Sequence, residues 1–163
     1  MRNAIIFLLT ILLIGCYARV PDVIGKEGQP IPGFKFLLRD GQSLVWTDTI
    51  KGNSPTVFLY FGTQCPYSRA EIQDIFDNMD EMQDIKFYFV TPDSLSYMQK
   101  VVDAYHLFGF SNLQVGQDCE YFISNHFDVH SVPTTLIYGK DHLLKAAFVG
   151  QINSGDITKY ARE

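Results

Sequence analysis

The sequence contains little cysteine and no excess of basic residues. Its 163 residues include only three cysteines, and 13 Lys and Arg residues stand against 18 Asp and Glu residues, which gives a formal charge of -5. Small secreted domains held by disulfides need more cysteines than this. A net negative chain also has no electrostatic reason to bind nucleic acid. We therefore expect no disulfide scaffold and no nucleic-acid partner, and the hydrophobic content of 47% predicts one globular domain.

The sequence also lacks an apolar run long enough to cross a membrane. The N-terminal stretch from Ala4 to Ile14 has eleven residues, whereas a spanning helix takes about 20. Arg2 precedes this stretch, so the segment is typical of a secretory signal. Its ending, Leu13-Ile14-Gly15-Cys16, resembles a bacterial lipobox, in which the cysteine is lipidated after cleavage. We therefore predict lipidation of Cys16, with an ordinary signal peptide and a chance cysteine as the alternative.

This ending defines the predicted organisation of the chain. Residues 1–16 are predicted to be a lipoprotein signal peptide, residues 17–29 a short linker, and residues 30–163 one domain. A lipid anchor implies a membrane as partner and a place in the bacterial cell envelope. Tyr17 stands where an aspartate typically retains such lipoproteins at the inner membrane. This difference favours the outer membrane, with the domain facing the periplasm.

Strand-like and helix-like patterns alternate along the predicted domain. The predicted strands are residues 34–38, 43–46, 56–61, 85–90 and 113–115, followed by a hairpin whose turn is at 139–142. Four helices are predicted. The first runs from Pro66 to about Met82, the second and third span 94–107 and 120–127, and the last begins at Gly155. In the first helix, apolar residues recur at helical spacing, and Glu71, Asp74, Asp77 and Asp80 are expected on the polar face. This order predicts an α/β fold with a central mixed sheet flanked by helices.

The stretch FGTQCPYS, residues 61–68, places Cys65 between a predicted strand and a predicted helix. Together with V-P-T-T at 132–135, which opens a later strand, this order of elements resembles the thioredoxin-like fold. It is most similar to the TlpA/ResA-type redoxins of bacterial envelopes, within the AhpC/TSA-thioredoxin group, over about residues 28–163. The resemblance implies an N-terminal β-hairpin, a family insertion, and a cis Pro133 beside the active cysteine.

The resemblance also implies how a substrate binds. The backbone of Val132, the residue before the proline, would pair with an extended substrate. Pro66 and Tyr67, which follow the active cysteine, complete the predicted substrate-binding set. Without the resemblance, Pro133 would be read as an ordinary trans proline at the start of a strand.

The chemistry expected of Cys65 follows from its place at the start of a helix. Unpaired N–H groups of the first turn, together with the helix dipole, favour the thiolate, which is the form that attacks disulfides or peroxides. Pro66 suits the first turn because its missing N–H would have no partner there. The alternative is a buried, inert cysteine that packs as a small apolar residue.

Ser68 stands where dithiol members of the family have a second cysteine. That cysteine breaks the mixed disulfide between the first cysteine and a substrate, and serine cannot do so. The Ser68 hydroxyl could still donate a hydrogen bond to the Cys65 thiolate. We therefore predict a monothiol variant, C-P-Y-S, whose mixed disulfide is resolved by an external thiol or by Cys119. One predicted strand precedes Cys65 and another precedes Cys119. If a third strand lies between them, the two are about 10 Å apart, which exceeds the ~7 Å between Cα atoms that a disulfide allows.

Other polar side chains allow more than one interpretation. Asp93 matches the position where, by the resemblance, a glutamate tunes the active cysteines, and it is equally suited to cap the helix over 94–107. His130 could line the substrate groove, or it could be an exposed loop residue. His126 and His130 are four residues apart, but His130 lies beyond the predicted helix end and no cysteine is near enough in the sequence to strengthen the case for a metal site. We therefore expect no metal and no cofactor, and a copper-chaperone role is disfavoured.

The sequence thus predicts a membrane-anchored thiol-disulfide oxidoreductase that acts through Cys65. Its expected partners are exported proteins or small thiols and disulfides. A thiol peroxidase is less well supported, because the T-x-x-C pattern of such proteins would need threonine where Gly62 stands. The non-enzymatic alternative is a redox-inactive thioredoxin-fold module that binds exported polypeptides.

Overall fold

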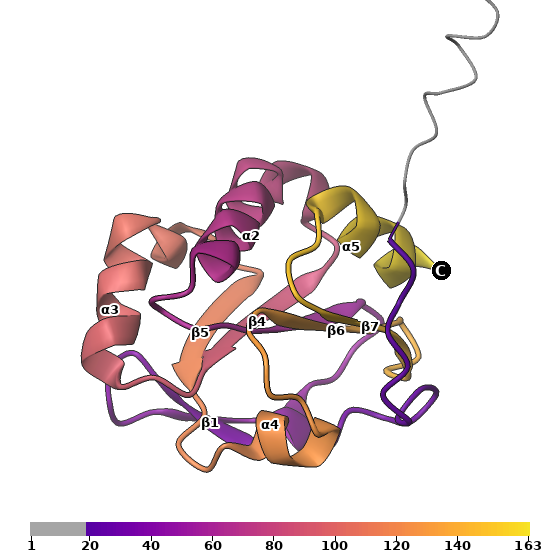
Figure 1. The fold of residues 1–163 in the computed structure, drawn as a ribbon, viewed down its shortest axis with the longest axis horizontal. Coiled ribbons are helices and arrows are strands. Elements are labelled where there is room, and N and C mark those ends of the chain that lie inside the picture. The colour runs from indigo at the N-terminus through magenta and orange to yellow at the C-terminus, as the bar shows by residue number, and fades with distance from the viewer. Residues whose placement is uncertain (1–18) are drawn as a thin grey trace, which may run out of the picture.

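Seven strands form one mixed sheet in the computed structural model, which describes residues 19–163 (Figure 1). The strands are β1 (Lys35–Leu38), β2 (Leu44–Trp46), β3 (Thr56–Tyr60), β4 (Lys86–Thr91), β5 (Leu113–Gln117), β6 (Thr134–Tyr138) and β7 (Leu144–Val149). Their order across the sheet is β2-β1-β5-β4-β3-β6-β7. The central strands β3, β4 and β5 are parallel, and the strands on either side pair antiparallel. The predicted mixed α/β sheet is confirmed.

The helices follow the predicted order, and the first three are shorter than predicted. They are α2 (Pro66–Asp77), α3 (Leu95–Ala104), α4 (Phe122–Phe127) and α5 (Ser154–Arg162), with 3-10 turns η1 (Thr47–Thr49), η2 (Met79–Met82) and η3 (Leu107–Gly109). The helix predicted over 94–107 ends at Ala104, and His106 then takes a left-handed conformation with φ 51°. The helix predicted from Glu120 begins at Phe122, because Tyr121 is also left-handed, with φ 53°. Such conformations interrupt the regular hydrogen bonding of a helix.

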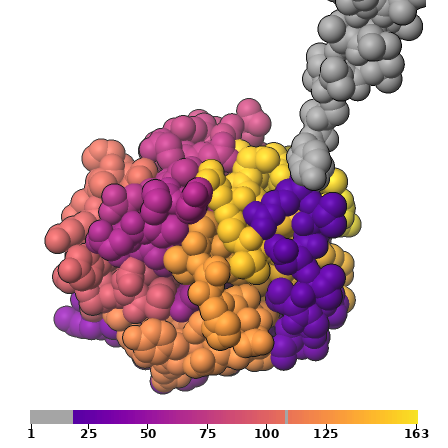
Figure 2. Space-filling model, in the orientation of Figure 1, coloured from indigo at the N-terminus to yellow at the C-terminus, as the bar shows by residue number. Residues whose placement is uncertain are grey.

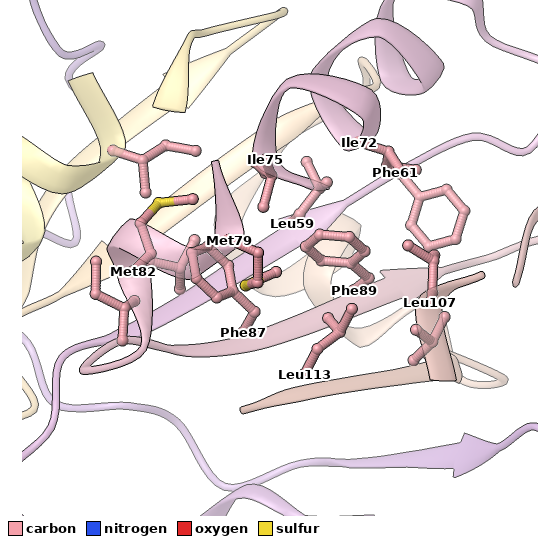
Figure 3. Close-up of a cluster of buried hydrophobic side chains, with 14 of the residues drawn as sticks. Leu59, Phe61, Ile72, Ile75, Met79, Met82, Phe87, Phe89, Leu107 and Leu113 are labelled. Carbon is pink, nitrogen blue, oxygen red and sulfur yellow. The ribbon is translucent and has the colours of Figure 1, made fainter. Parts of the chain in front are cut away.

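The helices cover both faces of the sheet. In Figure 1, α2, α3 and α5 lie over one face and α4 lies under the other. Side chains alternate along the buried strands, so Leu59 and Phe89 face the first layer, whereas Phe58 and Tyr88 face the second. Figure 3 shows the first core, where Ile72 of α2 packs above these strands. A sheet covered on both faces explains the continuous apolar runs of β3 and β4.

The segment before the first strand is bound to the last strand. The structure describes the predicted linker from Arg19 onward. Figure 2 shows this segment, in indigo, against the yellow C-terminal part of the chain. The Asp22 N–H donates to the Ala147 carbonyl at 2.8 Å, and the Gly28 N–H donates to the Leu144 carbonyl at 2.9 Å. These residues therefore cover the free edge of β7.

The predicted signal peptide and the lipidated Cys16 lie outside the described residues. Within residues 19–163, no helix has both the length and the apolar character needed to cross a membrane.

Candidate active site

Cys65 is the N-cap residue of α2. The chain leaves β3 at Tyr60 and turns through residues 61–64, and the Cys65 N–H donates to the Gly62 carbonyl at 3.1 Å. Cys65 has extended backbone angles, with φ -76° and ψ 121°, and Pro66 occupies the first turn of the helix. The Cys65 side chain is half-buried, so solvent and a partner can reach the sulfur. The predicted place of Cys65 at the start of a helix is confirmed.

The turn before β6 lies against the Cys65 sulfur. The Val132–Pro133 peptide bond is cis, and the Cys65 Sγ donates a hydrogen bond to the Val132 carbonyl at 3.3 Å. The Gly150 N–H donates to the Pro133 carbonyl at 2.7 Å and ties this turn to the end of β7. The prediction of a cis proline within reach of Cys65 is therefore confirmed.

Gly62 allows this close approach. A Cβ at position 62 would lie 2.8 Å from Val132 Cγ2 and 3.4 Å from Cys65 Cβ. The first distance is shorter than non-bonded carbon atoms tolerate. A residue with a side chain at position 62 would therefore push Val132 away from Cys65.

The pKa of Cys65 lies below its ordinary value. Burial is the largest single influence and raises the pKa, but hydrogen bonds from the Ser68 N–H, the Ser68 hydroxyl and the Tyr67 N–H together lower it by more. Ser68 is fully buried, and its Oγ also accepts a hydrogen bond from the Gly62 N–H at 3.2 Å. Ser68 thus stabilises the thiolate, in the predicted direction, and holds the preceding loop against the helix.

Asp93 holds the loop before Cys65 and does not cap a helix. Its Oδ2 accepts hydrogen bonds from the Thr63 N–H at 2.7 Å and the Thr63 hydroxyl at 2.6 Å. From the other side, Arg69 donates to the Thr63 carbonyl from Nε at 3.0 Å. The N-cap residue of α3 is Ser94, without a side-chain capping bond, so the capping interpretation of Asp93 is wrong. Asp93 acts on the loop that positions Cys65.

Glu71 is the site residue that sequence reasoning placed wrongly. It was expected on the polar face of α2, but it is fully buried. Its Oε1 accepts a hydrogen bond from the Thr135 hydroxyl at 2.5 Å, and its Oε2 accepts one from the Ile152 N–H at 3.1 Å. Burial raises the pKa of Glu71 to about 7, although both hydrogen bonds act to lower it.

A signal for the burial of Glu71 was present in the sequence. Ser68, Glu71, Ile72 and Ile75 follow the i, i+3, i+4, i+7 spacing of one helix face, and all four are buried. Glu71 therefore places a carboxyl group that can exchange a proton near neutral pH beneath the strand that follows Pro133.

Cys119 is distant from Cys65 in the sheet. Cys65 follows β3 and Cys119 follows β5, and β4 lies between these two strands. Strands β3 and β5 are therefore about 10 Å apart. Both cysteines are free thiols, and Cys119 is exposed. The condition considered for the sequence, one strand between these two, is therefore met.

The remaining sequence candidates are exposed or half-buried. His130 is exposed and pairs with Asp128 at 3.1 Å, in agreement with a loop residue. Val132 is half-buried, whereas Pro66 and Tyr67 are exposed. Tyr67 lines a cleft of about 660 Å³ together with Arg19 and Gly150. Among residues 19–163, no cluster of three or more His, Cys, Asp or Glu side chains is suited to hold a metal ion.

A helix-start cysteine beside a cis proline, on a mixed sheet of this order, defines a thioredoxin-like redoxin. Residues 27–147 match the model of the AhpC/TSA family. The chain therefore belongs to the AhpC/TSA family. Among curated proteins, none matches the sequence significantly.

Solved structures share the fold at low sequence identity. A secreted Mycobacterium tuberculosis disulfide oxidoreductase homologous to E. coli DsbE superposes with a TM-score of 0.66 and 16% identity, covering 78% of this chain and 93% of that one. StoA from Bacillus subtilis superposes with a TM-score of 0.64 and 11% identity, covering 83% of this chain and 99% of that one. Peroxidoxin BcpB from M. tuberculosis superposes with a TM-score of 0.68 and 13% identity, covering 83% of this chain and 94% of that one. These neighbours thus include both a disulfide oxidoreductase and a peroxidoxin.

Proposed function

We propose that this protein is a monothiol thiol–disulfide exchange protein that acts through Cys65. The observation that carries the proposal is the contact between the Cys65 Sγ and the Val132 carbonyl, beside a cis proline and at the start of α2. The lowered pKa of Cys65 favours the attacking thiolate. Pro66 and Tyr67 follow Cys65 in the chain and are exposed, so a bound polypeptide would contact them.

The proposed reaction begins with attack of the Cys65 thiolate on a substrate disulfide. A new S–S bond forms between Cys65 and one substrate sulfur, the old S–S bond breaks, and the other sulfur leaves as a thiolate. In a dithiol protein the next cysteine would displace the substrate, but Ser68 has no such chemistry. The mixed disulfide therefore persists until another thiol attacks it.

An external thiol is better supported as the resolving group than Cys119. The strands that precede the two cysteines are about 10 Å apart, more than the ~7 Å between Cα atoms that a disulfide allows without backbone movement. Cys119 is exposed and lies beyond β5, with β4 between it and the Cys65 strand.

The geometry at Gly62 argues against a thiol peroxidase. A threonine at this position, as the T-x-x-C pattern requires, would bring its Cβ to 2.8 Å from Val132. Val132 is also the residue whose carbonyl accepts the hydrogen bond from the Cys65 Sγ. The peroxidoxin neighbour shows that the fold allows such chemistry in another protein, but this site has a different arrangement.

We also propose that the protein acts outside the cytoplasm, held by a lipid on Cys16 at the outer membrane. Support comes from the secretory pattern before Cys16 and from the lipobox-like ending. The secreted M. tuberculosis neighbour shows that a fold of this kind occurs outside the cytoplasm. Exported polypeptides with disulfides would then be the substrates.

The reactivity of Cys65 tests the proposal directly. Alkylation of the native protein with iodoacetamide should be fast below the usual pKa of a thiol and should map to Cys65 by peptide mass spectrometry. Cys119 provides the internal comparison, because it is an exposed thiol on the same protein. If Cys65 reacts no faster than Cys119 between pH 6 and 8, the site is not redox-competent and the protein is better explained as a binding module.

A further inference from the structure

A second cleft lies on the other side of the loop that carries Cys65. This α2–α3 cleft has a volume of about 390 Å³, within the range of small-molecule sites, which is about 300–1,000 Å³. Thr63 and Gln64 of the loop form one wall, and Arg69 lies at the start of α2. Tyr97 and Lys100 of α3 face them, and in Figure 1 both helices cover the same face of the sheet.

The charge of the α2–α3 cleft is opposite to that of the whole chain. Its lining includes the cations Arg69 and Lys100 and contains no Asp or Glu, although the protein carries a formal charge of -5. Within residues 19–163 neither cation forms an ion pair, and the Lys100 Nζ lies 5.1 Å from the centroid of the Tyr97 ring. By contrast, the cleft beside Tyr67 contains Asp74 and Asp156.

The cleft is also close to the reactive sulfur along the chain. Gln64 lines it, and the Cα atom of the next residue, Cys65, is about 3.8 Å further. The Cys65 Sγ contacts the Val132 carbonyl and does not line the cleft, so a ligand bound there has to extend past Gln64 to bring a sulfur to Cys65. A ligand of tripeptide length, about 10 Å when extended, is long enough for this.

We propose that the α2–α3 cleft binds a small thiol that carries carboxylates and delivers it to Cys65 as the resolving thiol. Arg69 donates to the Thr63 carbonyl from Nε and Nη2, so Lys100 and the remaining N–H groups of Arg69 would hold the carboxylates. The rings of Tyr97 and Tyr105 would pack against the ligand's backbone. This inference rests on the proposed function, because it names the external thiol which a monothiol site requires. It also explains how a protein without a resolving cysteine selects a thiol.

The sulfur chemistry is a second disulfide exchange. The thiolate of the bound small thiol attacks the substrate sulfur in the mixed disulfide with Cys65. A new S–S bond joins the small thiol to the substrate, the bond to Cys65 breaks, and its electron pair remains on Cys65 as a thiolate. A second small thiol can then free the substrate thiol and leave as the symmetric disulfide. Each small thiol supplies one electron, so two reduce one disulfide.

The test compares an anionic with a neutral thiol on one preformed mixed disulfide. The full-length protein with Cys119→Ser is purified in a mild non-ionic detergent and treated with hydroxyethyl disulfide, so that Cys65 carries a neutral adduct. Release of the Cys65 thiol is then followed by mass spectrometry against the concentration of glutathione or 2-mercaptoethanol. We expect a saturating dependence on glutathione and a linear dependence on 2-mercaptoethanol.

Substitutions of Lys100 separate binding from chemistry. Lys100→Gln should raise the glutathione concentration for half-maximal rate about three-fold, because it removes one exposed ion pair. Lys100→Glu should raise it about ten-fold, because the new carboxylate also repels the carboxylates of glutathione. The rate with 2-mercaptoethanol should stay the same in both variants. Lys159→Glu is the matched control, because Lys159 is also an exposed lysine over a tyrosine ring, at 4.6 Å from the Tyr160 centroid. It should leave both rates unchanged.

The possible outcomes are distinct. If glutathione reacts without saturation and Lys100→Glu has no effect while Cys65 exchanges with both thiols, the proposed function stands and the cleft proposal is overturned. An equal loss in Lys100→Glu and Lys159→Glu would indicate overall charge and would also overturn it. If Cys65 forms no adduct at all, the proposed function itself fails.

Discussion

Glu71→Gln should make the protein more stable at alkaline pH and leave it unchanged in acid. Glu71 is fully buried, and burial raises its pKa from 4.5 to about 7. Because the folded protein retains the proton up to this higher pKa, the contribution of Glu71 to stability is fully present below about pH 4.5 and is lost as the pH rises to about 7. Glutamine resembles the protonated form and carries no charge to bury.

The magnitude follows from the size of the change. One pKa unit corresponds to about 1.36 kcal/mol, so a rise from 4.5 to about 7 corresponds to about 3 kcal/mol at pH 8 and above. This is a large part of the total free energy of unfolding of a domain, which is about 5–15 kcal/mol. Glutamine can accept from the Ile152 N–H and donate to the Thr135 hydroxyl, so the hydrogen bonds of the site are kept.

The assay is urea unfolding at pH 4, 5.5, 7 and 8.5, followed by circular dichroism and by the fluorescence of Trp46, the single tryptophan. All other titratable groups are the same in Glu71→Gln and wild type, so their contributions cancel in the difference between the two free energies of unfolding. Glu81→Gln removes a carboxylate from an exposed position and is the control. A difference that does not change with pH, or a variant less stable than wild type at pH 8.5, would refute the reasoning.

Three further predictions concern the sulfur site and the anchor. Ser68→Cys should create a C-P-Y-C pair and insulin-reductase activity, whereas wild type accumulates mixed disulfides at Cys65 with little turnover; equal turnover in both would show that resolution does not depend on position 68. Gly62→Thr should destabilise the domain by about 2 kcal/mol, because its Cβ would meet Val132 at 2.8 Å, and urea unfolding measures this loss. Cys16→Ser should release the protein from membranes, and fractionation unchanged by the substitution would count against a lipid anchor.

Much of the fold follows from local patterns in the sequence. The apolar runs at 56–61 and 85–90 predicted buried strands, and they are β3 and β4. The position of Cys65 between a strand and a helix was also predicted, because helix starts and strand ends depend on a few neighbouring residues. Helix bounds were less accurate, since left-handed residues such as His106 and Tyr121 end or delay a helix without a glycine signal.

The family resemblance added information that residue patterns alone do not carry. A cis bond at Pro133 is not the expectation for an isolated X-Pro pair, yet the V-P-T-T resemblance predicted it correctly. The same resemblance linked Asp93 to the active cysteine, but the contact is made with Thr63, in the loop before Cys65.

Only the tertiary structure decided which polar groups the site buries and which it exposes. Glu71 bonds to Thr135 and Ile152, which lie 64 and 81 residues further along the chain, so its burial depends on how β6 and the segment before α5 pack against α2. Arg69 and Lys100 line one cleft for the same reason, because α2 and α3 are brought together over the sheet. Local sequence therefore determined the elements and the position of the thiol. The surroundings that set its chemistry arise from contacts between distant segments, which periodicity and propensity do not encode.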